Sequence, residues 1–76
     1  MGYVPKPNPC FIDQFRFYKV IGGRKVYTGN GFYYSWDEKH GEIEVFNKQG
    51  YHLGALDPVT GSKIKKAKRE RTLHVQ

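Results

Sequence analysis

The chain of 76 residues is long enough for one small domain and too short for a two-domain enzyme. It holds 13 Lys and Arg residues against 7 Asp and Glu, a formal net charge of +6, which favours a polyanion as the partner. Its hydrophobic share of 38% is sufficient for a folded core, and its single cysteine excludes both an internal disulfide framework and a cysteine-based zinc site.

The first ten residues differ in composition from the rest of the chain. Pro5, Pro7 and Pro9 stand at alternate positions, which predicts an extended proline-rich arm over residues 1–10. We expect residues 11–76 to form one domain. Aromatic residues make up 16% of the chain and glycines recur at turn-like intervals, while no stretch shows a sustained helical period. The composition therefore predicts a mostly β fold, α+β at most.

The predicted elements follow one another as short strands separated by turns. One helical turn over residues 11–15 leads into them. We expect about five to six antiparallel strands, drawn from residues 15–20, 25–28, 33–37, 42–46, 51–56 and 62–66. Asp57-Pro58 opens the last turn with proline at its second position. In the final strand, Ile64 is expected to face the core, and Lys63 and Lys65 to face solvent.

The centre of the chain predicts a hairpin with two unlike faces. A four-residue loop over 38–41 would set strands 33–37 and 42–46 side by side, with side chains alternating between the faces. The apolar face, which we expect to face the core, consists of Tyr34, Trp36, Ile43 and Val45. The polar face consists of Tyr33, Ser35, Asp37, Glu42, Glu44 and Phe46, with His40 in the adjoining loop.

Three carboxylates on one face of a basic chain need a reason, because like charges repel one another and would repel an RNA backbone. One interpretation is a solvated acidic hairpin that balances nearby basic strands. A second is an acid–base set of Asp37, His40 and Glu44, able to move protons during cleavage of RNA through its own 2′-hydroxyl. A third is a divalent-cation site. We favour chemistry without a metal, since an arginine can neutralise the phosphorane.

Positive charge is concentrated near the C-terminus. Six basic residues and one acid fall between Ser62 and Arg71. We interpret this segment as a strip that follows RNA phosphates, with neighbouring aromatic rings for base stacking. The alternatives are a basic tail that adds solubility and, for the whole chain, a non-catalytic RNA-binding module. A metal-dependent DNA-cleaving enzyme would need metal-binding histidine clusters, which the sequence does not show.

Two motifs carry a resemblance to a known family. They are YSWDEKHGEIE over residues 34–44 and HLGALDPVTG over residues 52–61. Both resemble the C-terminal ribonuclease domain of the ribosome-inactivating colicins and cloacin, with its pattern Y-x-W-D-x-x-H-G-E-x-E, then H-L-G-x-x-D-P-x-T-G, then a basic end. The resemblance covers roughly residues 27–71. Residues 1–20 do not match it, which indicates a different delivery protein, such as a pyocin or a contact-dependent inhibition effector.

The resemblance implies a highly twisted antiparallel sheet and a toxin that makes one cut in small-subunit (16S) ribosomal RNA at the decoding site. It implies that no metal or other cofactor is needed. It further implies an acidic cognate immunity protein, delivery as part of a larger secreted or cell-surface toxin, and action in the cytoplasm of the target bacterium. No apolar run approaches the roughly 18 residues of a transmembrane helix, so no membrane-spanning segment is expected in this domain.

The resemblance also implies site residues. Family catalytic positions fall on Asp37, His40 and Glu44, and a family arginine falls on Arg71, with Arg69 as the competing choice. The expected substrate-binding residues are Lys65, Phe46, Tyr33, Lys63 and Arg69. Phe46 replaces a family tyrosine, which keeps base stacking but removes a hydroxyl contact. His52 is interpreted as structural and Cys10 as a small buried side chain.

The mechanism that we expect is transphosphorylation. Glu44 would take the proton from the ribose 2′-hydroxyl, and His40 would protonate the departing 5′-oxygen, leaving a 2′,3′-cyclic phosphate. Asp37 would orient His40 and keep it cationic. Arg71, supported by Lys65, would stabilise the charge that grows on the phosphate oxygens. The reverse division of roles, with His40 as base and Glu44 as acid, remains open.

Overall fold

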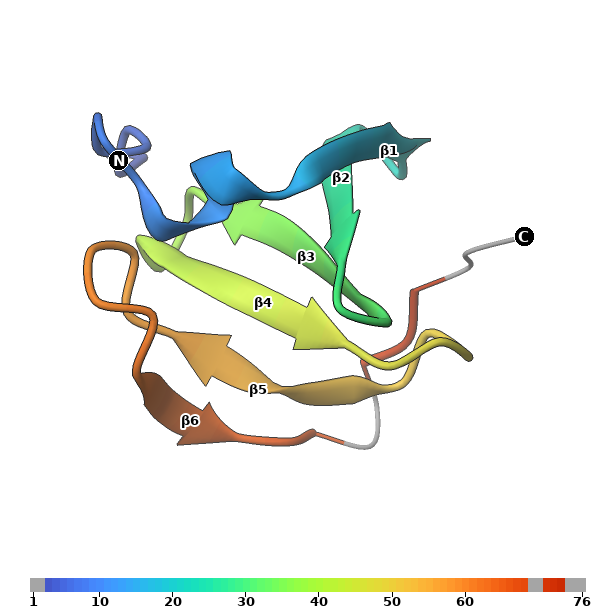
Figure 1. The fold of residues 1–76 in the computed structure, drawn as a ribbon. Coiled ribbons are helices and arrows are strands. Elements are labelled where there is room, and N and C mark those ends of the chain that lie inside the picture. The colour runs from blue at the N-terminus through green and yellow to red at the C-terminus, as the bar shows by residue number, and fades with distance from the viewer. Residues whose placement is uncertain (1–2, 69–70, 74–76) are drawn as a thin grey trace.

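Six strands form one antiparallel sheet in which each strand pairs with the next along the chain (Figure 1). The computed structural model describes residues 3–68 and 71–73. One turn of 3₁₀ helix, η1 (Phe11–Gln14), precedes β1 (Arg16–Ile21), β2 (Arg24–Gly29), β3 (Phe32–Asp37), β4 (Glu42–Phe46), β5 (His52–Leu56) and β6 (Lys63–Lys66). This confirms the predicted mostly β fold with one N-terminal helical turn. In the described part of the chain, no helix is long and apolar enough to cross a membrane.

The central hairpin has the predicted register. The opposed pairs of β3 and β4 include Tyr33–Phe46, Ser35–Glu44 and Asp37–Glu42. Figure 1 shows the strong twist, with β2 standing at a steep angle to β3 and β4. Register shifts interrupt three of the pairings, between β1 and β2, β4 and β5, and β5 and β6. Such bulges increase local twist and curve the sheet around the central hairpin.

The core lies on the apolar face of the hairpin and is closed by the N-terminal segment. Ile12 and Ile43 are both fully buried, and Cys10 is 6% exposed, as predicted. Phe15 stacks on Tyr34 with ring centroids 3.9 Å apart and an interplanar angle of 5°. Trp36 is half-buried against this cluster. The segment before β1 therefore covers one side of the core. A domain of this size has a thin core and needs such a cover.

The opposite face is also buried, although it is polar. Its buried side chains are Ser35, Asp37, Glu42, Glu44 and His52. A buried charge without a partner is strongly destabilising. Among the described residues, every buried side-chain nitrogen or oxygen has a hydrogen-bond partner. The polar face is therefore a satisfied network and not a solvated acidic surface.

One sequence expectation is wrong. Ile64 was expected to face the core, but its side chain is 50% exposed. β6 is an edge strand, and the register shift beside it pairs Ala55 with Lys65 and Leu56 with Lys63. Ile64 falls at the shift, where strict alternation does not apply. Lys63 and Lys65 are exposed, as expected.

Candidate active site

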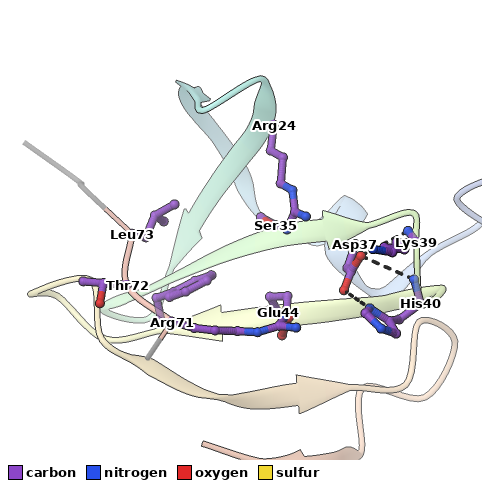
Figure 2. Close-up of a pocket in the computed structure, with 10 residues that line it drawn as sticks. Arg24, Ser35, Asp37, Lys39, His40, Glu44, Arg71, Thr72 and Leu73 are labelled. Atoms are coloured by element: carbon purple, nitrogen blue, oxygen red, sulfur yellow. Dashed lines mark hydrogen bonds and ion pairs between the residues drawn. The ribbon is translucent and has the colours of Figure 1, made fainter. Parts of the chain in front are cut away.

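A cavity of about 410 Å³ opens on the polar face of the central hairpin (Figure 2). The predicted catalytic residues Asp37, His40, Glu44 and Arg71 all line it, together with Ser35 and Phe46. Asp37 ends β3, Glu44 is in the middle of β4, and His40 comes from the loop between these strands. Arg71 reaches the cavity from the C-terminal segment, with its side chain running along β4 towards Glu44 (Figure 2). The structure therefore brings these four side chains together.

Asp37 fixes the position and the proton of His40. Its Oδ2 lies 2.8 Å from Nδ1 of His40, and its Oδ1 accepts the backbone N–H groups of Lys39 at 3.1 Å and His40 at 3.4 Å. Burial raises the pKa of Asp37, but these hydrogen bonds and the charge of the imidazole outweigh burial, so its pKa lies below the usual value. An ionised carboxylate only accepts hydrogen bonds, so Nδ1 of His40 carries a proton. Nε2 is then the nitrogen left for chemistry.

The loop itself depends on a glycine. Gly41 has a φ of 68°, and its N–H donates to the Asp37 carbonyl at 2.8 Å. That backbone conformation is unfavourable for residues with a Cβ. A Cβ at Gly41 would also come within 2.9 Å of Val4 Cγ1, because the arm passes directly beside the loop. The side chain of His40 is 42% exposed, so a substrate can reach it.

Glu44 lies deeper and is held from two sides. It is 1% exposed, its Oε1 accepts a hydrogen bond from Nη1 of Arg71, and its Oε2 lies 2.6 Å from Nε2 of His52. Both oxygens of this carboxylate therefore have a basic side chain as partner. Each carboxylate oxygen has two lone pairs, so Glu44 can still accept a further proton or hydrogen bond.

The C-terminal segment that carries Arg71 is attached to β5 and to the turn before it. Tyr51 and Thr72 form an isolated β-bridge, and Leu73 donates its N–H to the Gly50 carbonyl at 2.7 Å. Gly50 has a φ of 90°, and a Cβ at this position would overlap the carbonyl oxygen of Leu73. A glycine is therefore needed both for the turn and for the close approach of this segment.

The three carboxylates of the polar face are the residues that could offer ligands to a cation. One oxygen from each of Asp37, Glu42 and Glu44 lies within 4.8 Å of the others. Each carboxylate already contacts a basic group of the protein. Asp37 contacts the imidazole described above, Glu44 contacts Arg71, and Glu42 lies 3.1 Å from Nζ of Lys65. The repulsion within this cluster is thus offset by side chains of the same chain.

Of the expected substrate-binding residues that the structure describes, one lines the cavity and three lie outside its lining. Phe46 lines the cavity but is only 6% exposed, and its ring lies edge-on to His52 with centroids 5.4 Å apart. Tyr33 is half-buried and its ring lies 4.9 Å from that of Tyr18, outside the residues that line the cavity. Lys63 and Lys65 are on β6, also outside the described cavity lining. Arg69 lies outside the residues that the structure describes.

Three residues of the site were missed from the sequence. His52, interpreted only as structural, contacts Glu44, and Arg24 and Lys39 line the cavity. A signal for Arg24 was present, because Asn30-Gly31 is typical of a two-residue hairpin turn. Counting residues away from that turn pairs Val26 of β2 with Ser35 of β3. Two residues further from the turn, the same register places Arg24 beside Asp37.

Comparison with known proteins agrees with the two sequence motifs. The family model described as Cytotoxic matches residues 14–74. Colicin E3 from Escherichia coli is 45% identical over 47 residues, which cover 58% of this chain and 8% of the colicin. Cloacin, also from Escherichia coli, is 52% identical over 33 residues, and Colicin-E6 from the same organism is 41% identical over 44 residues. These matches cover 42% and 57% of this chain, and 6% and 7% of the relatives. The chain therefore belongs to the Cytotoxic family of colicin-type toxin domains.

Proposed function

We propose that this domain is a metal-independent endoribonuclease that cleaves 16S ribosomal RNA at the decoding site and so arrests translation. The observation that carries the proposal is the convergence of an imidazole, a buried carboxylate and a guanidinium on one cavity, in a chain of net charge +6. Family membership supports the toxin class. A non-catalytic RNA-binding module would not need a buried network of three carboxylates, whose desolvation is costly.

His40 acts as the general acid in the proposed reaction. Asp37 holds its Nδ1 proton, so the cationic ring presents Nε2–H to the 5′-oxygen that leaves. A buried, ionised carboxylate beside the ring stabilises the imidazolium. The exposure of this ring suits a group that must meet a phosphate on the surface of a ribosome.

Glu44 acts as the general base and Arg71 as the electrostatic partner. Glu44 accepts the proton of the ribose 2′-hydroxyl, and that oxygen attacks the adjacent phosphorus to give a 2′,3′-cyclic phosphate. Arg71 is in contact with Glu44 and is long enough to turn its remaining N–H groups to the phosphate oxygens. Its fixed charge takes the role that a metal ion fills in other nucleases.

The test is incubation of purified ribosomes with the domain in the presence of EDTA, followed by gel analysis of the RNA. One new fragment from the 3′ end of the small-subunit RNA is expected. His40→Ala and Glu44→Gln should each reduce the cleavage rate by about 10²–10⁴-fold and remove different limbs of the pH–rate profile. Intact RNA with retained ribosome binding would identify a binding module instead, and loss of cleavage in EDTA would contradict metal independence.

The proposed partners follow from the same charges. The domain is proposed to travel as part of a larger secreted or surface-delivered toxin and to act in the cytoplasm of the target bacterium. An acidic immunity protein is proposed to neutralise it in the producer, with an association rate that falls as salt rises. Stopped-flow association with the product of an adjacent short acidic gene, at increasing salt, tests this pairing.

A further inference from the structure

A second cavity, of about 440 Å³, lies next to the candidate active site. Arg24 and Lys39 line both cavities, so the two are neighbours around the end of β2 and the β3–β4 loop. The second cavity is lined by three aromatic side chains, Tyr3, Tyr27 and Trp36. Tyr27 and Trp36 belong to the apolar face of the sheet, opposite the face that carries Asp37 and Glu44.

The lining combines aromatic rings with positive charge. Lys6 and Lys25 join Arg24 and Lys39, against one carboxylate, Glu38. The Trp36 ring is fixed, because its Nε1–H donates to the Val4 carbonyl at 3.2 Å. Lys6 is 2.7 Å from Asp13, so the positive charge available to a ligand comes mainly from the other three cations. Aromatic faces bind nucleic-acid bases by stacking, and neighbouring cations bind the phosphates.

We propose that this second cavity binds an unpaired nucleotide of the RNA that flanks the cleavage site. The proposal rests on the proposed function, because RNA that lies at His40 must pass Arg24 and Lys39 to reach the aromatic side chains. Tyr3 and Lys6 lie before residue 14, where the family match begins. Part of this site is therefore supplied by the N-terminal arm of this chain.

Trp36 makes the proposal directly measurable, since it is the single tryptophan of the chain. The experiment uses the full chain with His40→Ala, which prevents cleavage, and titrates it with a short single-stranded oligoribonucleotide. We expect a saturable change in tryptophan fluorescence. Adding Tyr3→Ala and Lys25→Ala should weaken binding by about fivefold or more, whereas Lys48→Ala, at an exposed position that lines neither cavity, should change it less than twofold.

Several results would overturn the proposal. These are RNA binding by anisotropy without any fluorescence change, an equal response to poly-aspartate, or equal effects of Lys25→Ala and Lys48→Ala. Because no cleavage is measured, these outcomes are distinct from failure of the proposed function. That failure would appear as intact ribosomal RNA with the unmodified chain.

An independent observation concerns His52. Its side chain is 2% exposed, and its two ring nitrogens have different partners. Nδ1 accepts the backbone N–H of Lys68 at 2.9 Å, so this nitrogen carries no proton. The neutral ring therefore carries its proton on Nε2 and donates it to Oε2 of Glu44. The ring of Phe46 lies edge-on against it.

The same residue connects Glu44 to the segment that carries Arg71. The Lys68 carbonyl accepts the N–H of Arg71 at 3.2 Å, and the N–H of His52 donates to the Arg71 carbonyl at 3.4 Å. One imidazole thus contacts both the carboxylate and the backbone that leads to its guanidinium partner. We infer that His52 is a positioning residue, which sets the orientation of Glu44 and its alignment with Arg71. This inference also rests on the proposed function.

Two variants of similar shape test the two hydrogen bonds of the His52 ring independently. Asn can place its amide oxygen where Nδ1 lies and keep the Lys68 bond, whereas Gln can place its amide nitrogen where Nε2 lies and keep the bond to Glu44. Among the described residues, the charged or titratable groups around Glu44 are Arg71, Asp37 and Glu42, together with Arg24, Lys39 and His40 on the same cavity. We expect His52→Asn to lower kcat by about tenfold at unchanged KM and to move the acidic limb of the pH–rate profile to higher pH.

His52→Gln should retain the position of that limb. Rates are compared per folded molecule, with folding measured by circular dichroism and chemical denaturation. If both variants keep the wild-type rate and pH profile, or if both change stability alone, the positioning role is refuted. Full activity of Glu44→Gln would instead refute the proposed function.

Discussion

The two halves of the candidate site are held by different kinds of contact. The β3–β4 loop that carries His40 is closed by bonds between residues at most four positions apart, from Asp37 to Lys39, His40 and Gly41. Among the described residues, the segment that carries Arg71 has one local bond, to the Lys68 carbonyl, and is otherwise held by contacts distant in sequence, to Glu44, to His52 and to the neighbourhood of Gly50. Local bonds form with the hairpin itself, whereas distant contacts form only after a long chain segment is ordered.

The half with distant contacts is expected to open more readily than the half with local bonds. The bonds of the loop all start from Asp37, so we expect His40 and Asp37 to stay paired whenever the hairpin is folded. In the described part of this segment, Arg71 and Leu73 are half-buried and Thr72 is exposed. Regions with few buried contacts open with a lower free energy than the core. Perturbations of the C-terminal segment should therefore reduce activity before they reduce stability.

The largest expected loss of activity comes from Arg71→Ala. It removes the guanidinium that contacts Glu44, and with it the proposed stabilisation of the phosphate charge. We expect kcat for ribosomal RNA cleavage to fall by about 10²–10³-fold. Arg71→Lys should recover part of the rate, because lysine keeps the charge but not the planar pair of donors. Equal rates for Arg71→Ala and the unmodified domain would remove Arg71 from the site.

A smaller effect is expected from Gly50→Ala, which leaves every side chain of the cavity intact. Its Cβ would overlap the Leu73 carbonyl and displace the C-terminal segment. The matched control is Gly31→Ala, where φ is 82° but the nearest contact is the flexible end of Lys48 at 3.3 Å. Both variants carry the backbone penalty of about 1–2 kcal/mol in unfolding free energy.

Only Gly50→Ala should also reduce the cleavage rate, by about tenfold, through loss of the Arg71 charge from the phosphate. Urea denaturation and single-turnover cleavage measure the two quantities. Equal cleavage rates in Gly50→Ala and Gly31→Ala would show that docking of the segment does not limit the reaction.

The difference between local bonds and contacts distant in sequence also explains which features could be predicted from the sequence. The hairpin register followed from alternation and a four-residue loop, and it placed Asp37, Glu42 and Glu44 on one face with His40 beside them. These are local rules, and they hold in a strand pair without bulges. The prediction of Ile64 failed for the converse reason, since a register shift breaks alternation at the edge of the sheet.

The rest of the site depends on packing that no local pattern specifies. His52 shares the polar face with Glu44 only because of the shift between Val45 and Phe46. Its contact with Lys68 requires the chain beyond β6 to turn back over β5. Long-range contacts of this type leave no periodic signal in the sequence. The approach of Tyr3 to Trp36 across the second cavity is of the same kind.

The smallest expected effect concerns Asp37, in the half of the site that local bonds hold together. The folded pKa of Asp37 lies below its ordinary value of 3.8, so its ionisation stabilises the domain above about pH 3.8. This contribution is lost as pH falls through the lower folded pKa. Asp37→Asn keeps acceptors for the backbone bonds but loses the charge, which should cost about 1 kcal/mol in unfolding free energy at neutral pH. The difference between variant and unmodified domain should shrink as pH falls below 3.8. Urea denaturation at pH 7, 4 and about 2.5 measures it; a difference that is constant with pH would show that the carboxylate is not held ionised by the loop.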